Sequence, residues 1–364
     1  MRLIPIHRCM PGMRLGKKIY NEEGLVLLRE QVELTEQLIR RLQAMGVSFV
    51  YVADPRTDDL IVPDLIRDDT RRAVMSELRT NFKRMMEDTG RRRGMTQLFI
   101  GKQFKSVLST LIDDLSSHED AMIMLTNMSV TDLYLYEHSL NVCIYSVMLG
   151  IACGYSEDDL TTIGLGALLH DVGKTKIPLD ILLKPNKLTE AEFEVMKTHT
   201  EHGFRLLKDE PNIPLLSAHC AFQHHERLDG TGYPRGLKGE EIHEFARWIG
   251  LVDTYDAMTS HRVYRKAMLP HQAMEQLYAG AGSLYDLKML ETFRNKIALY
   301  PLGVSVTLSS GHKGIVVDVN TSHPQRPVIR ILQDSEGNDL KDLYEVDLSK
   351  QLNLVVTQVN DLSV

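Results

Sequence analysis

The longest apolar stretch of the chain spans residues 142–155 and reads VCIYSVMLGIACGY. It is too short to cross a bilayer and is interrupted by Gly150, so it predicts a helix buried within a folded domain. Apolar residues recur at helical spacing here and in the segments that follow: Leu140, Ile144, Val147, Ile151, Leu165, Leu168, Leu169, Phe193 and Met196. We therefore expect residues 129–299 to form an all-α domain of five or six helical segments with almost no strand.

Before this domain, residues 1–63 predict a small α+β module with a regulatory or packing role. Two short β-prone runs flank a turn at residues 21–24, and Thr35 caps an amphipathic helix that stops at Gly46 and leads into a strand. Residues 64–128 are polar with a helical period and predict a helical linker. The run Arg91–Arg93 in this linker could bind an anion, although a solvated loop is the commoner meaning of such a run.

After the domain, residues 300–364 predict a β-rich extension. The stretch GVSVTLSSGHKGIVVDVN at 303–320 is typical of a hairpin, and PVIRIL at 327–332 and LNLVVTQV at 352–359 predict further strands. The expected fold class is therefore mainly α: an all-helical metal-binding bundle with a small α+β N-terminal domain and a short β-rich C-terminal extension.

Composition is that of an ordinary soluble globular protein, with 364 residues, 43% hydrophobic and 25% charged. The net charge of -7 argues against a general nucleic-acid or anionic-membrane binder, but it allows a small phosphate ester to bind at a local cationic site. The four cysteines are widely spaced, which favours a reducing compartment. The first residues lack the apolar core of a secretory signal, so we expect a cytoplasmic protein.

Chemistry-bearing residues gather in the helical domain, which holds ten of the fourteen histidines between positions 138 and 271. Each has an ordinary explanation when taken alone, because a single histidine on a helix is more often structural than a ligand. Asp253, inside an apolar run, could equally cap a helix or pair with Arg247 or Arg262. Seven residues spread over five helical segments nevertheless match the needs of two closely spaced metal ions: His138, His170, Asp171, His199, His224, His225 and Asp253.

Asp171 follows His170 directly, and adjacent helical residues point about 100° apart, so the carboxylate can bridge two ions while the imidazole binds one. His138, His170 and Asp253 would complete one site, and the remaining three histidines the other. Mixed nitrogen and oxygen ligation favours iron or manganese over a structural zinc. A bridging hydroxide could then attack phosphorus in an anionic ester, and Lys174 would add a cation beside the phosphate or leaving group, unless it is only a surface lysine.

Three motifs together resemble the HD-GYP family, a branch of the HD superfamily of metal-dependent phosphohydrolases: HDVGK at 170–174, HHERLDGTGYP at 224–234 and VDTYDAMTSHRVYRKA at 252–267. Residues 1–63 resemble, more weakly, a module often found ahead of such domains. The resemblance implies hydrolysis of cyclic di-GMP to pGpG or GMP, or of cyclic GMP-AMP in some members. It implies the same seven metal ligands, with Asp171 and Lys174 acting in catalysis.

The resemblance also implies substrate contacts from Lys174, Gly232, Tyr233, Pro234, Arg262, Arg265 and Lys266. Arginine suits this role because its planar fork pairs with phosphate and stacks on a base, whereas Lys266 could simply be part of a solvated helix end. The glycines of the DGTGYP segment could likewise serve only a helix stop and a turn. We interpret them as leaving room for a bulky dinucleotide.

Two positions depart from the family pattern. Some members carry a glutamate four residues before the first histidine and hold a third metal; here that position is Tyr134, and Glu137 points in another direction, so a binuclear site is expected. His261 and Val263 replace the usual acidic residue and proline in SHRVYR, which leaves substrate preference open. The alternatives are a preference for cyclic GMP-AMP or pGpG, and a catalytically silent receptor or adaptor. A homodimer or a signalling-protein partner is compatible with either reading.

Overall fold

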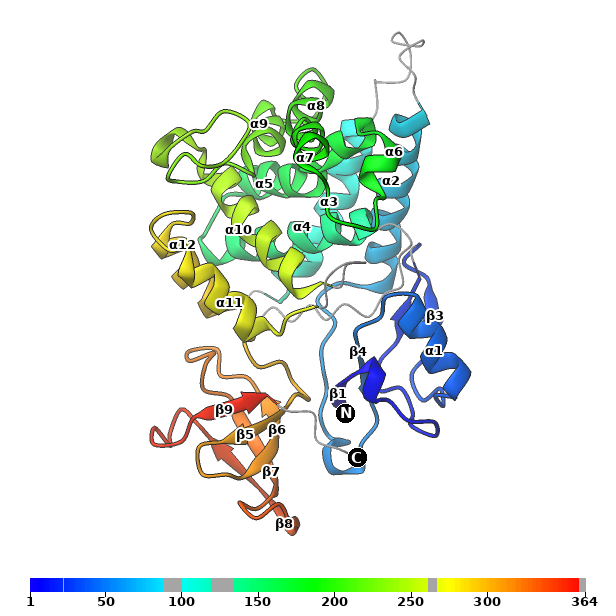
Figure 1. The fold of residues 1–364 in the computed structure, drawn as a ribbon, viewed down its shortest axis with the longest axis vertical. Helices are drawn as coiled ribbons and strands as arrows, with labels where there is room; N and C mark the ends of the chain where they lie inside the picture. Colours follow the sequence, from blue (N-terminus) through cyan, green and yellow to red (C-terminus); the bar gives the residue numbers. More distant parts are fainter. Residues whose placement is uncertain (22, 88–99, 119–133, 261–266, 360–364) are drawn as a thin grey trace.

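The computed structural model describes residues 1–21, 23–87, 100–118, 134–260 and 267–359. A helical bundle occupies one end of the molecule, and two smaller units containing strands lie beneath it (Figure 1). The mainly α fold class is confirmed. The runs Arg91–Arg93 and Arg262–Lys266 lie outside the described residues.

The bundle begins with α2 and α3, which pack into its core through Leu78, Phe82, Phe104 and Leu108. The segment expected to be a linker therefore contributes helices to the bundle itself. The helices of the bundle have these bounds: α2 Asp68–Glu87, α3 Ile100–Ser116, α4 Tyr134–Ala152, α5 Glu157–Leu169, α6 Leu179–Leu182, α7 Glu190–Lys197, α8 His199–Leu207, α9 Leu215–Gln223, α10 Glu244–Thr259, α11 Pro270–Ala279 and α12 Leu287–Lys296.

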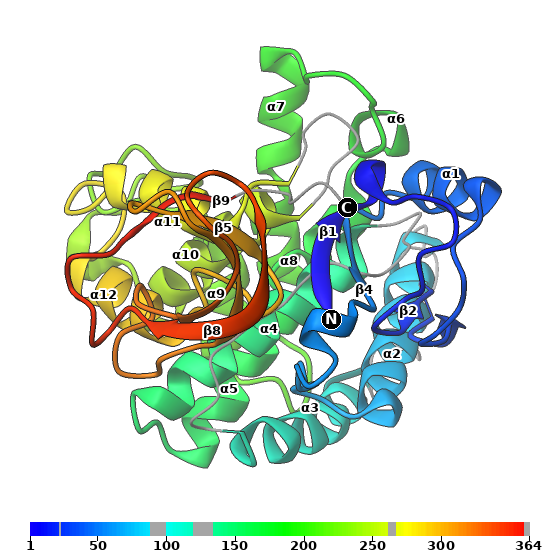
Figure 2. The same cartoon turned by 90° about the horizontal axis from the view of Figure 1, so that it is seen from below.

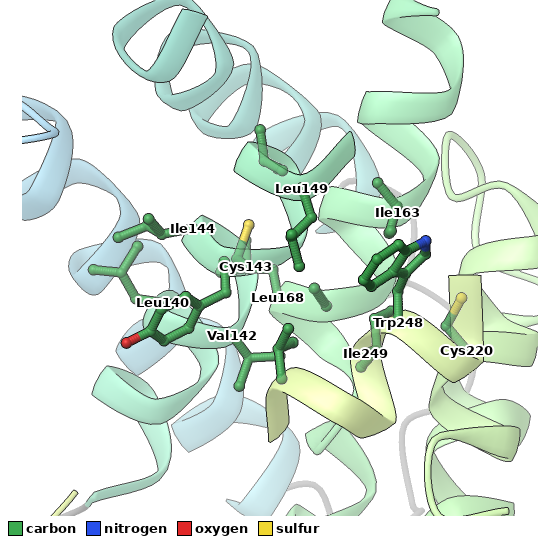
Figure 3. Packing of buried hydrophobic residues seen from close by; sticks show 14 of the residues in the cluster. Leu140, Val142, Cys143, Ile144, Leu149, Ile163, Leu168, Cys220, Trp248 and Ile249 are labelled. Atoms are coloured by element: carbon green, nitrogen blue, oxygen red, sulfur yellow. The ribbon is translucent and has the colours of Figure 1, made fainter. Parts of the chain in front are cut away.

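The apolar stretch at 142–155 forms most of α4, the central helix of the bundle. Every residue from 135 to 150 is buried, so α4 has no solvent-exposed face over these turns. Figure 3 shows its side chains meeting α5, α9 and α10 through Leu168, Cys220, Trp248 and Ile249. Removing such contacts by a leucine-to-alanine change costs about 2–5 kcal/mol, which is enough to make this packing decisive for the fold.

The expectation of five or six helical segments between residues 129 and 299 was too low, because the described part of this range contains nine α-helices. The region after α5 is divided into short helices by local signals. Pro178 precedes α6, and Thr189 starts α7 with a capping box closed by Glu192. No residue of α7 is buried, and Phe193 is 44% exposed, so this helix stands outside the core.

The N-terminal unit contains two antiparallel strand pairs and one helix. Its elements are β1 Arg2–Pro5, β2 Ile19–Tyr20, β3 Val26–Leu28, α1 Glu36–Ala44 and β4 Phe49–Val52. β1 pairs with β4, with Leu3 opposite Tyr51, and β2 pairs with β3. The predicted cap is confirmed, because the Thr35 side chain accepts a hydrogen bond from the Leu38 amide at 3.2 Å.

The C-terminal unit is a five-stranded antiparallel sheet with the order β8-β7-β6-β5-β9. Its strands are β5 Ser305–Leu308, β6 Lys313–Asp318, β7 Val328–Gln333, β8 Asp339–Asp347 and β9 Val356–Val359. The predicted hairpin is β5–β6, with Ser305 opposite Ile315. β8 is the longest strand and escaped prediction because its sequence, DLKDLYEVD, is charged and mostly exposed.

The two smaller units are joined although they come from opposite ends of the sequence. They share one hydrophobic cluster, in which Leu3 and Tyr51 pack with Val306 and Ile331. Tyr51 also donates its hydroxyl hydrogen to the Leu302 carbonyl at 3.0 Å. Seen from below, the N-terminal strands and the C-terminal sheet lie side by side (Figure 2).

An ion pair reinforces this junction at its edge. The Arg330 guanidinium on β7 lies 2.6 Å from Asp59 and 2.7 Å from Glu345, so it links the N-terminal unit to the sheet. Among the described residues, no helix has the length and apolar character needed to span a membrane.

Candidate metal centre

The seven predicted ligands come together inside the bundle, from five helices that are distant in sequence. They occupy these places: His138 on α4, His170 at the C-cap of α5 with Asp171 next, His199 at the start of α8, His224 at the C-cap of α9 with His225 next, and Asp253 on α10. Six of the seven are buried, and His225 is partly exposed. The cluster is thus a packed interior site with one open side.

Ligand atoms form two groups that share Asp171. One group contains His138, His170 and Asp171, and the other contains Asp171, His199, His224 and His225; within each group the ligand atoms lie within 4.8 Å of one another. A carboxylate common to two groups of imidazoles is the arrangement expected for a bridging ligand.

The two oxygens of Asp171 face different groups. Oδ2 lies 3.4 Å from His170 Nε2 and 3.8 Å from His138 Nε2. Oδ1 lies 3.4 Å from His199 Nε2 and 3.8 Å from His224 Nε2. One oxygen is therefore directed to each group, which is the geometry a bridge between two ions requires.

Three of the histidine rings are held by the same local device. Nδ1 lies 2.7 Å from the carbonyl oxygen of Ala167 in His170, 2.7 Å from that of Met196 in His199, and 3.0 Å from that of Ala221 in His224. Each partner is three residues earlier, at the end of the preceding helical turn. Because a neutral imidazole has one donor and one acceptor nitrogen, donation from Nδ1 leaves Nε2 as the lone-pair donor facing the site.

His138 is oriented by side chains instead. Its Nδ1 lies 2.7 Å from Asp256 Oδ2, and its Nε2 lies 3.0 Å from Asp253 Oδ1. Asp256 is itself held by the Asn141 amide at 3.0 Å and the Ser260 hydroxyl at 3.2 Å. Asp253 Oδ2 lies 3.9 Å from His225 Nδ1, so this carboxylate stands beside the first group and reaches toward the second.

Burial and charge set the protonation of the cluster. Burial lowers the pKa of His199 to about 4 despite the nearby Asp171 carboxylate. Burial and the neighbouring imidazoles hold the pKa values of His224 and His225 well below their ordinary range. These histidines are therefore neutral at physiological pH, which is the form that binds a metal.

The two carboxylates and His138 instead favour their charged forms. Burial opposes ionisation of Asp171, but Lys174 and His170 outweigh it and hold its pKa well below the usual value. The pKa of Asp253 is likewise held well below its usual value, since His138 outweighs burial. Burial lowers the pKa of His138, yet hydrogen bonds to Asp253 and Asp256 raise it to about 9, so a metal at Nε2 must displace a proton.

Two polar atoms of the cluster are left without partners. His170 Nε2 and Asp171 Oδ1 are fully buried and make no hydrogen bond with any described residue. Unpaired buried polar atoms cost free energy, and a divalent cation in each ligand group would supply the missing interaction, to His170 Nε2 in one group and to Asp171 Oδ1 in the other. The donor set, five imidazoles and two carboxylates, therefore fits a pair of divalent transition-metal ions.

Lys174 lies at the edge of the cluster, in a short 3₁₀ turn at Val172–Lys176. Its ammonium donates to Asp171 Oδ2, and 23% of its side chain is exposed. The same cation that stabilises the carboxylate is thus partly accessible to solvent.

Gly173, beside Lys174, lets this turn approach α8 closely. A Cβ at this position would lie 1.8 Å from the His199 carbonyl oxygen and 2.5 Å from the Gly203 amide nitrogen. No side chain larger than hydrogen fits. The glycine of the HDVGK motif therefore sets the distance between Asp171 and His199.

The segment after His225 folds back over that residue. The Tyr233 ring lies 4.6 Å from the His225 ring at an interplanar angle of 31°, and its amide donates to the His225 carbonyl at 3.2 Å. Lys197 lies over the Tyr233 ring at 5.6 Å. Tyr233 thus covers one face of the cluster, and Pro234 follows it through a cis peptide bond.

The reason for Gly232 differs from the one expected. A Cβ there would lie 2.4 Å from the Arg227 nitrogen and 2.5 Å from the His225 carbonyl oxygen. The glycine permits the chain to pack on its own backbone, so the space it leaves is filled by protein and not by a ligand.

Two residues that hold the site were missed from the sequence. Asp256 orients His138, and Glu226 accepts hydrogen bonds from the Arg235 amide at 2.8 Å and the Leu237 amide at 3.0 Å, which closes the loop. Asp256 follows Asp253 by three residues, which places both carboxylates on one face of α10 and could have revealed it. Glu137 is buried but belongs to neither metal group in the described part of the chain.

Fold and site together define a helical metal-binding domain whose ligands are histidine and aspartate. Residues 110–289 match the family described as HD domain, and residues 305–363 match the family described as KOW domain associated with HD domain. Residues 110–289 therefore contain an HD domain, in agreement with the HD superfamily to which the motifs pointed. The KOW match identifies the C-terminal sheet, which sequence reasoning had described only as β-rich.

Relatives named as cyclic-dinucleotide phosphodiesterases match part of this chain. A cyclic di-GMP phosphodiesterase of Pseudomonas aeruginosa is 34% identical over 246 residues, 66% of this chain and 59% of that protein. One of Thermotoga maritima is 42% identical over 164 residues, 44% of each chain. A 3'3'-cGAMP-specific phosphodiesterase of Vibrio cholerae is 34% identical over 168 residues, 46% of this chain and 36% of that protein. The chain thus spans less than two thirds of each relative.

Among solved structures, an HDG"Y"P protein from Bdellovibrio bacteriovorus aligns with a TM-score of 0.46 at 15% identity. The alignment covers 80% of this chain and 97% of that one.

Proposed function

We propose that this protein is a metal-dependent phosphodiesterase that hydrolyses cyclic di-GMP to pGpG or GMP. The observation that carries the proposal is the division of Asp171 between two imidazole groups, one oxygen to each. In this proposal the ligands are His138, His170, Asp171, His199, His224, His225 and Asp253. The names of the relatives from Pseudomonas aeruginosa and Thermotoga maritima support the choice of substrate.

Iron or manganese is the proposed metal, since the donors are imidazole and carboxylate and no cysteine belongs to either described group. A pair of such ions supplies Lewis acidity and a nucleophile at neutral pH when it is bound. Burial holds His199, His224 and His225 neutral, so that these three imidazoles are available to the ions at neutral pH.

The remaining site residues bind and orient the substrate in this proposal. Lys174 can exchange its contact with Asp171 for a phosphate oxygen once metal charge replaces it on the carboxylate. Tyr233 packs on the His225 ring at the edge of the site, where it would contact the substrate, and Gly232 and Pro234 fix its position. Arg262, Arg265 and Lys266 are proposed to contact phosphates and bases.

The other proposed features concern the whole protein. We propose residues 129–299 as the catalytic unit and residues 1–63 as a regulatory or packing module. A cytoplasmic location is supported by four cysteines that are all free thiols. A homodimer or a signalling-protein partner remains part of the proposal.

The function is tested by quantifying metal in protein purified without oxygen and analysing products after incubation with cyclic di-GMP. We expect about two ions per chain, and we expect His199→Ala to lower turnover at least about 100-fold because a metal ligand is lost. His202→Ala is the matched control, because His202 lies on the same helix, three residues on, and belongs to neither metal group.

Substrate preference is tested by comparing turnover of cyclic di-GMP, 3'3'-cGAMP and pGpG. The second candidate is a cGAMP phosphodiesterase. The cGAMP-specific relative favours it, because that protein is 34% identical to this chain, the same identity as the Pseudomonas aeruginosa relative. The enzyme proposal fails if the metal-loaded protein cleaves none of the three and its cellular effect survives His170→Ala. The protein would then be a silent receptor.

A further inference from the structure

The carbonyl oxygen of His224 lies close against α10. His224 is the C-cap of α9, and its imidazole belongs to one of the two metal groups. On α10, a Cβ at Gly250 would lie 2.3 Å from this oxygen and 3.2 Å from Nη1 of Arg227. The missing side chain of Gly250 therefore lets the end of α9 approach α10, one helical turn before Asp253.

The guanidinium of Arg227 provides the partner for this carbonyl. Its Nη1 donates hydrogen bonds to the His224 carbonyl at 3.1 Å and to the Glu226 carbonyl at 2.9 Å. The last carbonyls of a helix have no partner within the helix, so a buried helix end needs a donor from elsewhere. His224 is fully buried, and Arg227 supplies that donor from three residues further along the chain.

The same guanidinium also contacts α10. Its Nη2 donates to Thr254 Oγ1 at 3.4 Å, and the Tyr285 hydroxyl donates to the same oxygen at 3.1 Å. Thr254 gives its own hydrogen to the Gly250 carbonyl at 2.8 Å, so its hydroxyl makes all three bonds of which it is capable. The guanidinium carbon lies 5.2 Å from the centre of the Tyr285 ring, which adds a cation–π contact.

These contacts join two elements that both carry metal ligands. On one side is the end of α9 with His224 and His225, and on the other is α10 with Asp253, directly before Thr254. Across this junction His225 Nδ1 lies 3.9 Å from Asp253 Oδ2. Movement of either element would therefore change the separation of the ligand atoms.

We propose that Arg227 is a positioning residue of the metal centre. By holding the His224 carbonyl against α10, its guanidinium sets the separation of His224 and His225 from Asp253. The inference rests on the proposed metal-dependent function and deepens it, since Arg227 acts through the ligands and not on the substrate.

A phosphate of the substrate is the competing partner for this arginine, because guanidinium groups commonly bind phosphate. Three of the five N–H donors that a guanidinium carries are here directed to protein oxygens, and the group lies over the Tyr285 ring. The geometry therefore favours an internal role over a contact with the substrate.

The test is titration of the metal-free protein with Mn²⁺ in competition with a chelator, together with kcat and KM for cyclic di-GMP at saturating Mn²⁺. In Arg227→Met we expect one ion to bind about tenfold more weakly and kcat to fall about tenfold, with KM changed by less than about twofold. Arg227→Lys keeps the charge but not the planar fork, and should recover little of the lost affinity.

Arg294→Met is the matched control. Arg294 also lies over a tyrosine ring, that of Tyr278 at 5.9 Å, but its hydrogen bonds go to Asn295 on its own helix. Metal affinity and kcat should stay at their wild-type values in this variant. A loss of affinity as large as that in Arg227→Met would overturn the inference, because it would show a general effect of removing an arginine.

Two further results would contradict the inference. A raised KM with unchanged metal affinity in Arg227→Met would assign the arginine to the substrate. Unchanged affinity and kcat would show that Arg227 does not position the ligands, while the proposed reaction would stand. Weaker metal binding in Arg227→Met, in a protein that cleaves no cyclic dinucleotide, would support the positioning role and end the proposed reaction.

Thermal melts show whether Arg227→Met folds. If it does not, Thr254→Val takes its place, because valine has nearly the same volume and lacks the oxygen that Arg227 contacts. Weakening of the same ion by about threefold would support the inference, and unchanged affinity would overturn it.

Discussion

The histidines of the metal centre are prepared for coordination by their hydrogen bonds, and two different devices do this. His170, His199 and His224 each use the carbonyl three residues earlier, which is local and comes with the helix end. His138 lies within α4, where backbone carbonyls are already engaged, and depends on the side chain of Asp256.

Asp256→Asn is expected to weaken metal binding at the group that contains His138 by roughly 10- to 100-fold, because the amide no longer fixes the imidazole as the charged acceptor does. Competition with a chelator measures this. The control is Asp286→Asn, which makes the same change at the cap of α12. Equal metal affinities in the two variants would show that Asp256 does not orient His138 for metal binding.

The seven residues themselves could be predicted, because histidine and aspartate in joined motifs are rare and chemically distinctive. Asp256 was missed although it follows Asp253 by three residues on α10, since its role depends on a contact with His138, 118 positions away. The reason for Gly232 was also hidden, because the neighbouring backbone that demands it is known only once the loop is folded.

At the scale of elements, the metal centre depends on how closely the turn after α5 approaches α8. Gly173 determines this distance, as a Cβ would lie 1.8 Å from the His199 carbonyl oxygen. The chain cannot relieve this contact by a side-chain rotation, because both partners are backbone atoms. Any added carbon must therefore move α8, and His199 moves with it.

Gly173→Ala is expected to destabilise the protein by about 1–3 kcal/mol through overpacking and to lower turnover about 100-fold through displacement of His199. Urea unfolding and product analysis measure the two effects. Gly203→Ala is the matched control on α8, since its new Cβ would meet Ala221, Gly173 and Val172 only at ordinary contact distances of 3.4, 3.5 and 3.7 Å. Full activity in Gly173→Ala would show that the turn has room to move.

The helices were predictable from the spacing of their apolar residues, and the β5–β6 hairpin from its β-prone runs and turn residues. The strand β8 was not, because strand formation at Asp339–Asp347 follows from pairing with β7 and not from its own charged sequence. The short helices α6, α7 and α8 were also not separated, since their boundaries depend on single residues such as Pro178.

For the whole molecule, the stability of the metal-free protein should depend on pH through its buried histidines. In the folded chain the pKa of His199 is about 4, whereas in the unfolded chain it is about 6.5. Its contribution is complete above about pH 6.5 and is lost as pH falls toward 4, by on the order of 3 kcal/mol. His224 and His225 act in the same direction.

His138 opposes them, because its pKa of about 9 gives a contribution that is present below pH 6.5 and lost between 6.5 and 9. Three histidines outweigh one, so urea unfolding of the metal-free protein should show lower stability at pH 5 than at pH 7. Equal or greater stability at pH 5 would contradict this protonation pattern.

The joining of the two smaller units was beyond sequence reasoning, because contacts between distant segments leave no local period. It also has a consequence for synthesis. Tyr51 and the Leu302 carbonyl that it contacts are 251 positions apart. At about 5–20 residues per second, a ribosome adds that length in roughly 10–50 s. During that interval Leu3 and Tyr51 lack their covering strands, so the N-terminal unit emerges early and is completed late, with an apolar surface open to chaperones until the sheet arrives.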